Sequence, residues 1–327
     1  MLFFGTSAFA VPILESVAAT HDVAGVVTQP DRPAGRGKKL EPTPVRRAAE
    51  ALGLRVFTPE RLKPFVEEAS ALRPGAFVVA SYGKILPQAL LDLVPIAFNV
   101  HPSLLPLYRG ATPLQSALRD GRAETGVTII AMDRGMDTGD VLVQVRVPIE
   151  AGETYGALHD RTAALGATLV AAAIDAYENG TLAREPQRDA ARRLGIGEDE
   201  IAATSTRPWS KDDWVLDPRA RAGALDALVR ALSPDPGARL SVPELGTVAV
   251  LAAHRDEGPA FADPHPTDDV APGALVRSSQ RLWLRAADGW LELERVRPPG
   301  RNAMTAREFL SGYGRYVRDA PAQPAPR

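Results

Sequence analysis

Short apolar runs alternate with stretches of helical periodicity through the first half of the chain. The runs predict strands at residues 1–4, 23–28, 76–81, 96–100, 126–132 and 141–147. Apolar residues recur at helical spacing between them, at residues 12–20, 44–52, 61–72 and 113–120. Alternation of strand and helix is typical of a mainly parallel sheet that is covered on both faces. We therefore predict an α/β domain.

The second half has a different pattern. A long helix is predicted over 154–177, because Leu158, Leu165, Leu169 and Ile174 occur there among many alanines. It is expected to end near Asn179 and Gly180, a common helix-ending pair. Further on, one helix is predicted at 222–232, with short apolar runs at 246–253, 273–276, 281–286 and 290–296. Several short strands with a single helix favour a small β-barrel, and a generic α+β fold is the alternative.

The length of the chain predicts two domains, and so does the change of pattern between its first and second halves. At 327 residues the chain exceeds the size at which single cores usually stop growing. We expect a first domain at 1–182, a polar linker at 183–207 and a second domain at 208–319. The last residues, 320–327, are rich in proline and alanine and are expected to be a disordered tail.

Composition narrows the class of protein. Hydrophobic residues make up 45% and charged residues 24%, which is typical of a soluble globular protein. No apolar run is long enough to span a membrane, and the start of the chain lacks a secretory signal, so we expect a cytoplasmic protein. The chain has no cysteine, which excludes disulfides, thiolate metal sites and cysteine nucleophiles. Histidine, aspartate or serine must carry any catalysis.

A basic segment stands out against the net charge of −2. Between residues 32 and 47 a single acid, Glu41, accompanies a set of basic residues: Arg32, Arg36, Lys38, Lys39, Arg46 and Arg47. A cationic loop that also contains glycine and proline suits a polyanion. An ordinary solvated surface loop explains the charge equally well. Six arginines between 277 and 301 have the same two interpretations: a cationic surface, or solvated strand edges balanced by nearby acids.

Two polar residues end the apolar run at 96–100. Asn99 and His101 are two residues apart, so on a strand their side chains project to the same face. Ligands of open α/β sheets bind beyond the carboxyl ends of the strands. The pair therefore marks a candidate active site, although a histidine near a strand end is often only hydrogen-bonded there.

A second polar cluster, residues 132–140, connects two predicted strands and contains Asp133, Asp137 and Asp140. Its spacing does not fit the calcium-loop pattern and no metal site is expected. Asp137 matters only if the fold brings it to His101. An amide donor, an imidazole base and a carboxylate would then suit acyl-type transfer to an amine, with no covalent enzyme intermediate.

Other enzyme motifs fit poorly. The chain lacks a complete dinucleotide fingerprint, a phosphate loop, a zinc-protease helix motif and a serine elbow. Five segments instead resemble the methionyl-tRNA formyltransferase family: residues 28–40, 81–87, 99–110, 125–129 and 132–140. They cover most of the first 180 residues.

The resemblance implies a Rossmann-like formyltransferase domain with a mainly parallel sheet, joined to a C-terminal OB-like β-barrel. It implies 10-formyltetrahydrofolate as donor, methionyl initiator tRNA as acceptor, and Asn99, His101 and Asp137 as the catalytic trio. The implied folate site contains Ser103, Leu104, Leu105, Pro106, Ile85 and Leu86. The implied tRNA contacts of the basic loop are Arg36, Lys38 and Lys39.

Alternatives follow from the resemblance itself. Formyltransferases that act on a nucleotide sugar or on glycinamide ribonucleotide share the trio, but the basic loop and second domain favour the tRNA substrate. A folate- or tRNA-binding protein with an inactive trio is a further alternative. This chain also departs from the family pattern at Leu107, where a basic residue is common. We expect a monomer without a metal.

Overall fold

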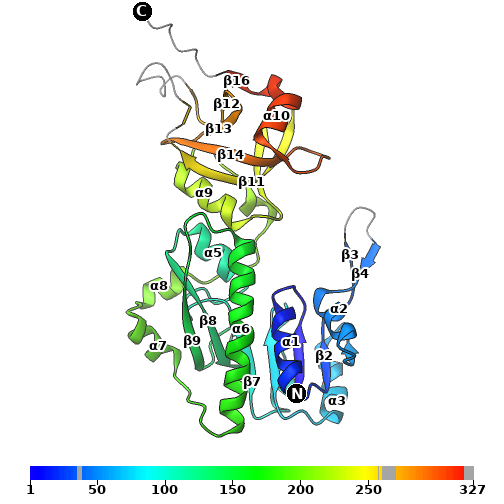
Figure 1. The fold of residues 1–327 in the computed structure, drawn as a ribbon. Coiled ribbons are helices and arrows are strands. Elements are labelled where there is room, and N and C mark those ends of the chain that lie inside the picture. Colours follow the sequence, from blue (N-terminus) through cyan, green and yellow to red (C-terminus); the bar gives the residue numbers. More distant parts are fainter. Residues whose placement is uncertain (35–38, 257, 260–269, 320–327) are drawn as a thin grey trace, which may run out of the picture. The chain divides into compact units, whose positions relative to one another are not determined.

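The computed structural model describes residues 1–34, 39–256, 258–259 and 270–319 (Figure 1). The chain divides into two compact units, and each is described by itself. Unit 1 comprises Met1–Pro113, Glu124–Pro148 and His159–Arg207, and unit 2 comprises Leu114–Ala123, Ile149–Leu158 and Pro208–Arg327. Arg36 and Lys38, two of the predicted tRNA contacts, and the predicted tail lie outside the described residues.

Unit 1 is built on a seven-stranded sheet of order β5-β2-β1-β6-β7-β8-β9. Its strands are β1 (Leu2–Gly5), β2 (Gly25–Val27), β5 (Val56–Phe57), β6 (Phe77–Ala80), β7 (Ala97–His101), β8 (Glu124–Ala131) and β9 (Val141–Pro148). The first five in the sheet order are parallel, and β8 and β9 are antiparallel. β1 and β6 are buried on both faces, as their continuous apolar sequences predict. The predicted mainly parallel sheet is confirmed.

Helices cover both faces of this sheet. They are α1 (Ala10–Thr20), α2 (Pro44–Ala51), α3 (Leu62–Ala71), α4 (Gln88–Leu91) and α6 (Tyr155–Glu178). A further helix, α5 (Pro113–Arg119), belongs to unit 2 from Leu114 onward. Apolar residues of α3 and α4 pack with Phe4, Phe77 and Ala97 on one face. On the other face α6 approaches so closely that a Cβ on Gly166 would meet Val100. Alternate residues of β7 therefore face different layers.

The basic segment forms the base of a hairpin. β3 (Arg32–Ala34) pairs antiparallel with β4 (Lys39–Glu41). The hairpin is tied to the sheet because Arg32 donates to Gln29, and the Gln29 amide donates to the carbonyl of Tyr82 (2.8 Å). Thr43 caps the helix α2 that follows, since its hydroxyl accepts from the Arg46 amide (3.0 Å).

The segment at 183–207 differs from the expected linker. It forms α7 (Gln187–Leu194) and α8 (Glu198–Ala203) and belongs to unit 1. The isolated bridge between Val141 and Glu185 adds the segment to the edge strand β9. The buried residues of the segment are small or polar: Gln187, Ala190, Ala191 and Thr204. Small and polar buried groups leave no hydrophobic pattern, so the sequence gives little sign of this packing.

Unit 2 contains a curled sheet of order β10-β11-β14-β13-β12-β16, with β15 paired to β14. Its elements are η1 (Lys211–Trp214), α9 (Ala222–Ala231), β10 (Ala238–Val242), β11 (Gly246–Asp256), β12 (Leu275–Ser278), β13 (Arg281–Arg285), β14 (Trp290–Arg297), β15 (Met304–Thr305), α10 (Ala306–Tyr313), η2 (Gly314–Tyr316) and β16 (Arg318–Asp319). The predicted OB-like fold is confirmed. The strands β10, β15 and β16 and the helix α10 were not predicted.

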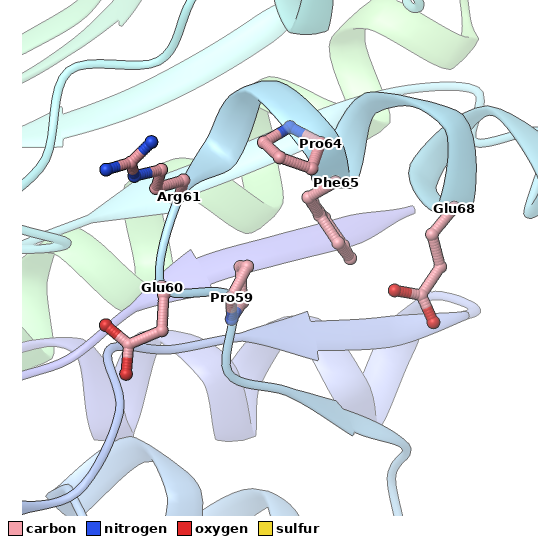
Figure 2. Close-up of a pocket in the computed structure, with 6 residues that line it drawn as sticks. All are labelled: Pro59, Glu60, Arg61, Pro64, Phe65 and Glu68. Carbon is pink, nitrogen blue, oxygen red and sulfur yellow. The ribbon is translucent and has the colours of Figure 1, made fainter.

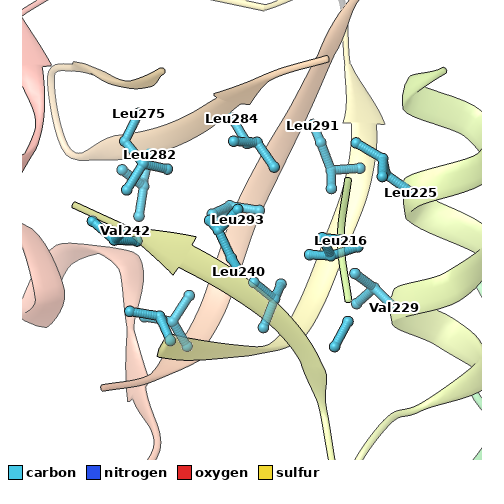
Figure 3. Close-up of a cluster of buried hydrophobic side chains, with 14 of the residues drawn as sticks. Leu216, Leu225, Val229, Leu240, Val242, Leu275, Leu282, Leu284, Leu291 and Leu293 are labelled. Carbon is cyan, nitrogen blue, oxygen red and sulfur yellow. The ribbon is translucent and has the colours of Figure 1, made fainter. Parts of the chain in front are cut away.

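The core of unit 2 is aliphatic. Leu240, Leu284 and Leu291 from the sheet are fully buried against Leu225 and Val229 of α9 (Figure 3). Asp288 fixes the start of α9 from a distant turn, because its carboxylate accepts from the Ala222 amide (2.7 Å) and pairs with Arg221. This long-range cap closes the helix onto the sheet.

In the described part of the chain, no helix is both long and apolar enough to cross a lipid bilayer. In the longest helix, α6, polar residues interrupt the apolar sequence at several positions.

Candidate active site

Asn99 and His101 lie on β7 at the edge of the sheet where its parallel strands end. Asn99 is level with Val79 of β6 and Ile130 of β8, and His101 is level with Thr128. His101 is buried and Asn99 is half-buried. Both side chains lie on one face of the strand, as the spacing of two predicts.

Asp137 reaches this pair from the loop between β8 and β9. Its Oδ1 accepts from Asn99 Nδ2 (3.1 Å), and its Oδ2 accepts from the Gly110 amide (2.9 Å). His101 Nδ1 lies 3.6 Å from Asp137 Oδ2. The fold therefore brings together the three residues that the sequence singled out, and the carboxylate is only 16% exposed.

The hydrogen bonds of His101 assign its tautomer. Nε2 lies 3.0 Å from the Tyr108 carbonyl oxygen, which can only accept, so Nε2 carries a proton. In the neutral ring Nδ1 then holds a lone pair on the side of Asp137. A proton taken up at Nδ1 produces an imidazolium that faces the carboxylate. The geometry makes Nδ1 a proton acceptor whose charged form has a partner.

Three residues around the site have positive φ angles: Ser81 (42°), Tyr108 (57°) and Asp137 (54°). Non-glycine residues with such angles are uncommon and cluster at functional sites. Two glycines near the site allow other backbone segments to pack directly against them. A Cβ on Gly110 would lie 2.1 Å from the Thr206 carbonyl oxygen, and one on Gly139 would lie 1.8 Å from that of Ala131.

The loop after His101 is stabilised by buried side chains and by hydrogen bonds of Ser103. Ser103, Leu104, Leu105 and Pro106 are all buried. The Ser103 hydroxyl donates to the Leu107 carbonyl (2.6 Å), and the Ser103 carbonyl accepts from Thr128 (2.7 Å). The side chains of residues 103–106 therefore pack inside the protein and stabilise the loop. Ligand contacts from this segment would have to come from its backbone.

Ile85 and Leu86 differ from each other. Leu86 is buried in the core under α3 and α4, whereas the Ile85 side chain is 75% exposed. Ile85 lies in the loop that follows β6, the strand beside β7. Met136, next to Asp137, is also exposed, and Arg134 of its loop donates to Gln88 Oε1 (3.1 Å). Two exposed apolar side chains thus stand on loops that flank the trio.

The other aspartates of the 132–140 cluster serve the turn. Asp133 Oδ1 accepts from the Gly135 amide (2.9 Å) and from the Thr138 hydroxyl (2.7 Å). Two histidine–acid clusters occur elsewhere in the described part of the chain, at His21 and at His254. Neither includes a residue of the trio.

Sequence reasoning missed the contribution of the segment at 183–207. The Gln187 amide contacts Arg109 and the loop of Asp137. Thr206 donates its backbone amide to the Arg109 carbonyl (2.8 Å), and its hydroxyl accepts from the Thr112 amide (3.2 Å). Burial lowers the pKa of the Arg109 guanidinium, and the negative charge of Asp137 acts in the opposite direction. No motif marks these residues, because their partners are remote in sequence.

A shallow hollow lies at the far side of unit 1. It is lined by Pro59, Glu60, Arg61, Pro64, Phe65 and Glu68 (Figure 2). Three strands separate β5, which precedes it, from β7 in the sheet. Lys84 donates its ammonium to the carbonyls of Pro59 (3.1 Å) and Glu60 (3.0 Å). The hollow is therefore distinct from the trio.

The predicted basic contacts are only partly placed. Lys39 lies on β4, and only its backbone is described. In unit 2, Arg277 pairs with Asp319, and Arg281 pairs with Glu292 and Asp256. These two arginines of the candidate cationic surface are therefore balanced by acids, as the second interpretation of that segment expects.

Comparison with known proteins assigns the two halves of the chain consistently. The formyl transferase family matches residues 1–174, and the formyl transferase C-terminal domain matches residues 209–314. A methionyl-tRNA formyltransferase of Halorhodospira halophila is 42% identical over 327 residues, with 99% of each chain covered. One of Gluconobacter oxydans is 39% identical over 317 residues, covering 95% of this chain and 96% of the relative.

Solved structures share the fold at lower identity. HypX from Aquifex aeolicus in complex with tetrahydrofolic acid has a TM-score of 0.63 at 17% identity, covering all of this chain and 49% of HypX. An N-formyltransferase from Helicobacter canadensis, in complex with folinic acid and dTDP-3-aminofucose, has a TM-score of 0.63 at 17% identity, covering 89% and 97%.

Proposed function

The chain belongs to the formyl transferase family, and on this basis we propose that it formylates the α-amino group of methionyl initiator tRNA. The donor is 10-formyltetrahydrofolate, and the product serves translation initiation. The observation that carries the proposal is the match over nearly the whole chain to proteins named methionyl-tRNA formyltransferase. The convergence of Asn99, His101 and Asp137 supports it, because these groups suit the chemistry.

The proposed roles of the trio follow from their hydrogen bonds. As the amine nitrogen bonds to the formyl carbon, it loses a proton, which His101 Nδ1 accepts. Asp137 faces the resulting imidazolium and stabilises its charge. The proton then moves to the nitrogen that leaves as the old C–N bond breaks. No residue becomes covalently attached.

Asn99 stabilises the oxygen of the formyl group. One hydrogen of its Nδ2 is directed to Asp137, and the second remains to donate to an oxygen that gains negative charge. The bond to Asp137 fixes the amide in this orientation before the reaction. Fixed donors are effective because they do not have to reorganise as the charge develops.

The donor site is proposed on the loops that flank the trio. The exposed side chains of Ile85 and Met136 offer apolar surface to a flat ring system. Leu86 supports Ile85 from the core. Residues 103–106 fix the path of the loop that ends at Gly110, whose amide holds Asp137. The roles proposed above use protein groups alone, and we propose no metal for this site.

The acceptor is proposed to contact the basic hairpin through Arg36, Lys38 and Lys39, and to contact unit 2. Binding through phosphates predicts a steep loss of affinity with rising salt. We propose that the enzyme acts as a monomer in the cytoplasm, where charged initiator tRNA occurs.

The direct test is an assay with 10-formyltetrahydrofolate and methionyl initiator tRNA. Formylmethionyl-tRNA should accumulate, and uncharged tRNA should give no product. Nucleotide amino sugars and glycinamide ribonucleotide serve as competing acceptors. Turnover of one of these small amines in place of the tRNA would contradict the assignment, as would binding of both substrates without turnover.

A further inference from the structure

We propose that Gln187, at the start of α7, is a positioning residue that holds the loop of Asp137 in its reactive place. The role rests on the proposed function, because it acts on the carboxylate assigned to that reaction. Gln187 lies 50 residues from Asp137 in sequence. It belongs to the segment expected as a linker, and its side chain is only 5% exposed.

All four hydrogen-bonding positions of the Gln187 amide are used. Nε2 donates to the backbone carbonyls of Asp137 (2.7 Å) and Gly139 (2.8 Å). Oε1 accepts from Nε (3.0 Å) and Nη2 (2.6 Å) of Arg109. An amide has two donor hydrogens and two acceptor lone pairs, so no capacity is left for a ligand. The group is therefore fitted to hold protein segments together.

The two hydrogen bonds that Gln187 Nε2 donates stabilise the loop at a residue with an unfavourable backbone conformation. Asp137 has a φ of 54°, a conformation that costs energy and persists only when its surroundings impose it. The bonds to the carbonyls of Asp137 and Gly139 hold the backbone that follows the Cα of this residue. Hydrogen bonds from the Asn99 side chain and the Gly110 backbone amide then select the position of the carboxylate. Gln187 fixes the backbone of Asp137, and Asn99 and Gly110 fix its side chain.

The two hydrogen bonds that Gln187 Oε1 accepts hold the Arg109 guanidinium in place. The Arg109 guanidinium is attracted by the negative charges of Asp137 and Asp133. While it donates to Gln187 through two nitrogens, its charge is directed to a neutral amide. Asp137 thus keeps its oxygens for Asn99, Gly110 and His101. Gln187 therefore links the 108–110 loop to the 137–139 loop.

The test compares three variants in the formylation assay. Gln187→Leu has a similar size and removes every bond. Gln187→Glu keeps acceptors for Arg109 but offers no hydrogen to the two carbonyls when ionised. Both should lower kcat by about 100-fold, the loss expected from a misplacement of about 1 Å, with KM for both substrates near the wild-type value. Arg188→Ala, an exposed neighbour on the same helix, should leave kcat unchanged.

A double-mutant cycle separates positioning from general damage. If Gln187 acts through Asp137, adding Gln187→Leu to Asp137→Ala should cause no further loss of single-turnover rate beyond about twofold. Independent, multiplying losses would overturn the role, as would wild-type kcat in Gln187→Glu. Melting followed by circular dichroism verifies that each variant is folded. A wild-type chain without formylation would overturn the proposed function itself, whereas an active wild type with an unaffected Gln187→Leu variant would overturn only the positioning role.

Discussion

Each member of the trio has a partner that fixes its orientation. The Tyr108 carbonyl directs the proton of His101, and Asn99 and Gly110 hold the two oxygens of Asp137. The sequence predicts that Asn99 and His101 share a face, because strand geometry places alternate residues together. It does not predict these partners, since Tyr108 and Gly110 act through backbone groups that carry no residue-specific signal.

Replacing Asn99 by alanine should lower kcat by 10²–10³-fold. This corresponds to roughly 2.7–4 kcal/mol of barrier, the usual cost of removing an oxyanion donor. The change also frees Asp137 Oδ1, so the larger loss is expected. Steady-state formylation kinetics measure the effect, and Asn179→Ala, at an exposed helix end, is the matched control. Unchanged turnover in Asn99→Ala would refute the role.

Tyr82 makes stability depend on alkaline pH. Burial raises the pKa of its phenol to about 12, from an ordinary value of 10.0. Between these values the unfolded chain loses the proton and the folded chain keeps it, so the free energy of unfolding falls as pH rises. The difference corresponds to roughly 2–3 kcal/mol by pH 12. Urea unfolding at pH 8 to 12 measures it.

The Tyr82→Phe variant should lack this alkaline loss. Among the described residues, the Tyr82 hydroxyl is buried with no hydrogen-bond partner, so its removal should not weaken the protein at neutral pH. Tyr177→Phe provides the comparison on α6. An equal alkaline loss in the Tyr82→Phe variant and the wild type would assign the effect to another group.

At the scale of elements, hydrophobic patterning predicted the buried strands and the long helix. The strands predicted near 76–81 and 96–100 appear as β6 and β7, and the predicted helix at 154–177 appears as α6. The pattern failed for α7, because it buries alanines and a polar amide in place of large apolar side chains. It failed for α8 because none of the residues of that helix is buried. Strand β16 was missed because it has only two residues, both exposed and charged, which carry no apolar pattern.

The hairpin of β3 and β4 carries the proposed electrostatic contact with tRNA. Replacing Arg36, Lys38 and Lys39 together by alanine should weaken tRNA binding most at low salt. Each phosphate contact contributes about 0.7–0.9 to the slope of log affinity against log salt, so the slope should fall by roughly 2–3. Filter binding between 50 and 300 mM salt measures it.

A matched triple variant tests whether position matters as well as charge. Arg55, Arg61 and Lys63 are exposed residues on or beside α3, outside the hairpin. Their replacement by alanine should leave the slope unchanged. The same decrease in both triple variants would indicate a general charge effect and would contradict a specific contact at the hairpin.

The whole molecule combines two units with separate cores, and their fluorescence differs. All four tryptophans, Trp209, Trp214, Trp283 and Trp290, lie in unit 2. Unfolding followed by tryptophan emission therefore reports on unit 2, whereas circular dichroism reports on both units. The two-domain organisation follows from chain length and the change in pattern near residue 180, but the assignment of segments 114–123 and 149–158 to unit 2 requires the structure.

Leu291→Ala should destabilise unit 2 by about 2–5 kcal/mol, because the side chain is fully buried and its removal leaves a cavity. The tryptophan-monitored transition in urea should move to lower denaturant. Leu90→Ala, at an equally buried position of unit 1, should leave that transition in place and alter only the dichroism. If Leu90→Ala moves the tryptophan transition as far, the two units unfold as one.

The contacts of Gln187 and Thr206 decide where this enzyme can be divided. A fragment that stops after the long helix α6 would keep every residue of the trio and lose the groups that brace Arg109 and Asp137. We therefore expect that a fragment needs to extend to Arg207 to keep full activity. The family match ends at residue 174. That boundary marks where the sequences align, and the groups that hold Arg109 and Asp137 in place lie beyond it.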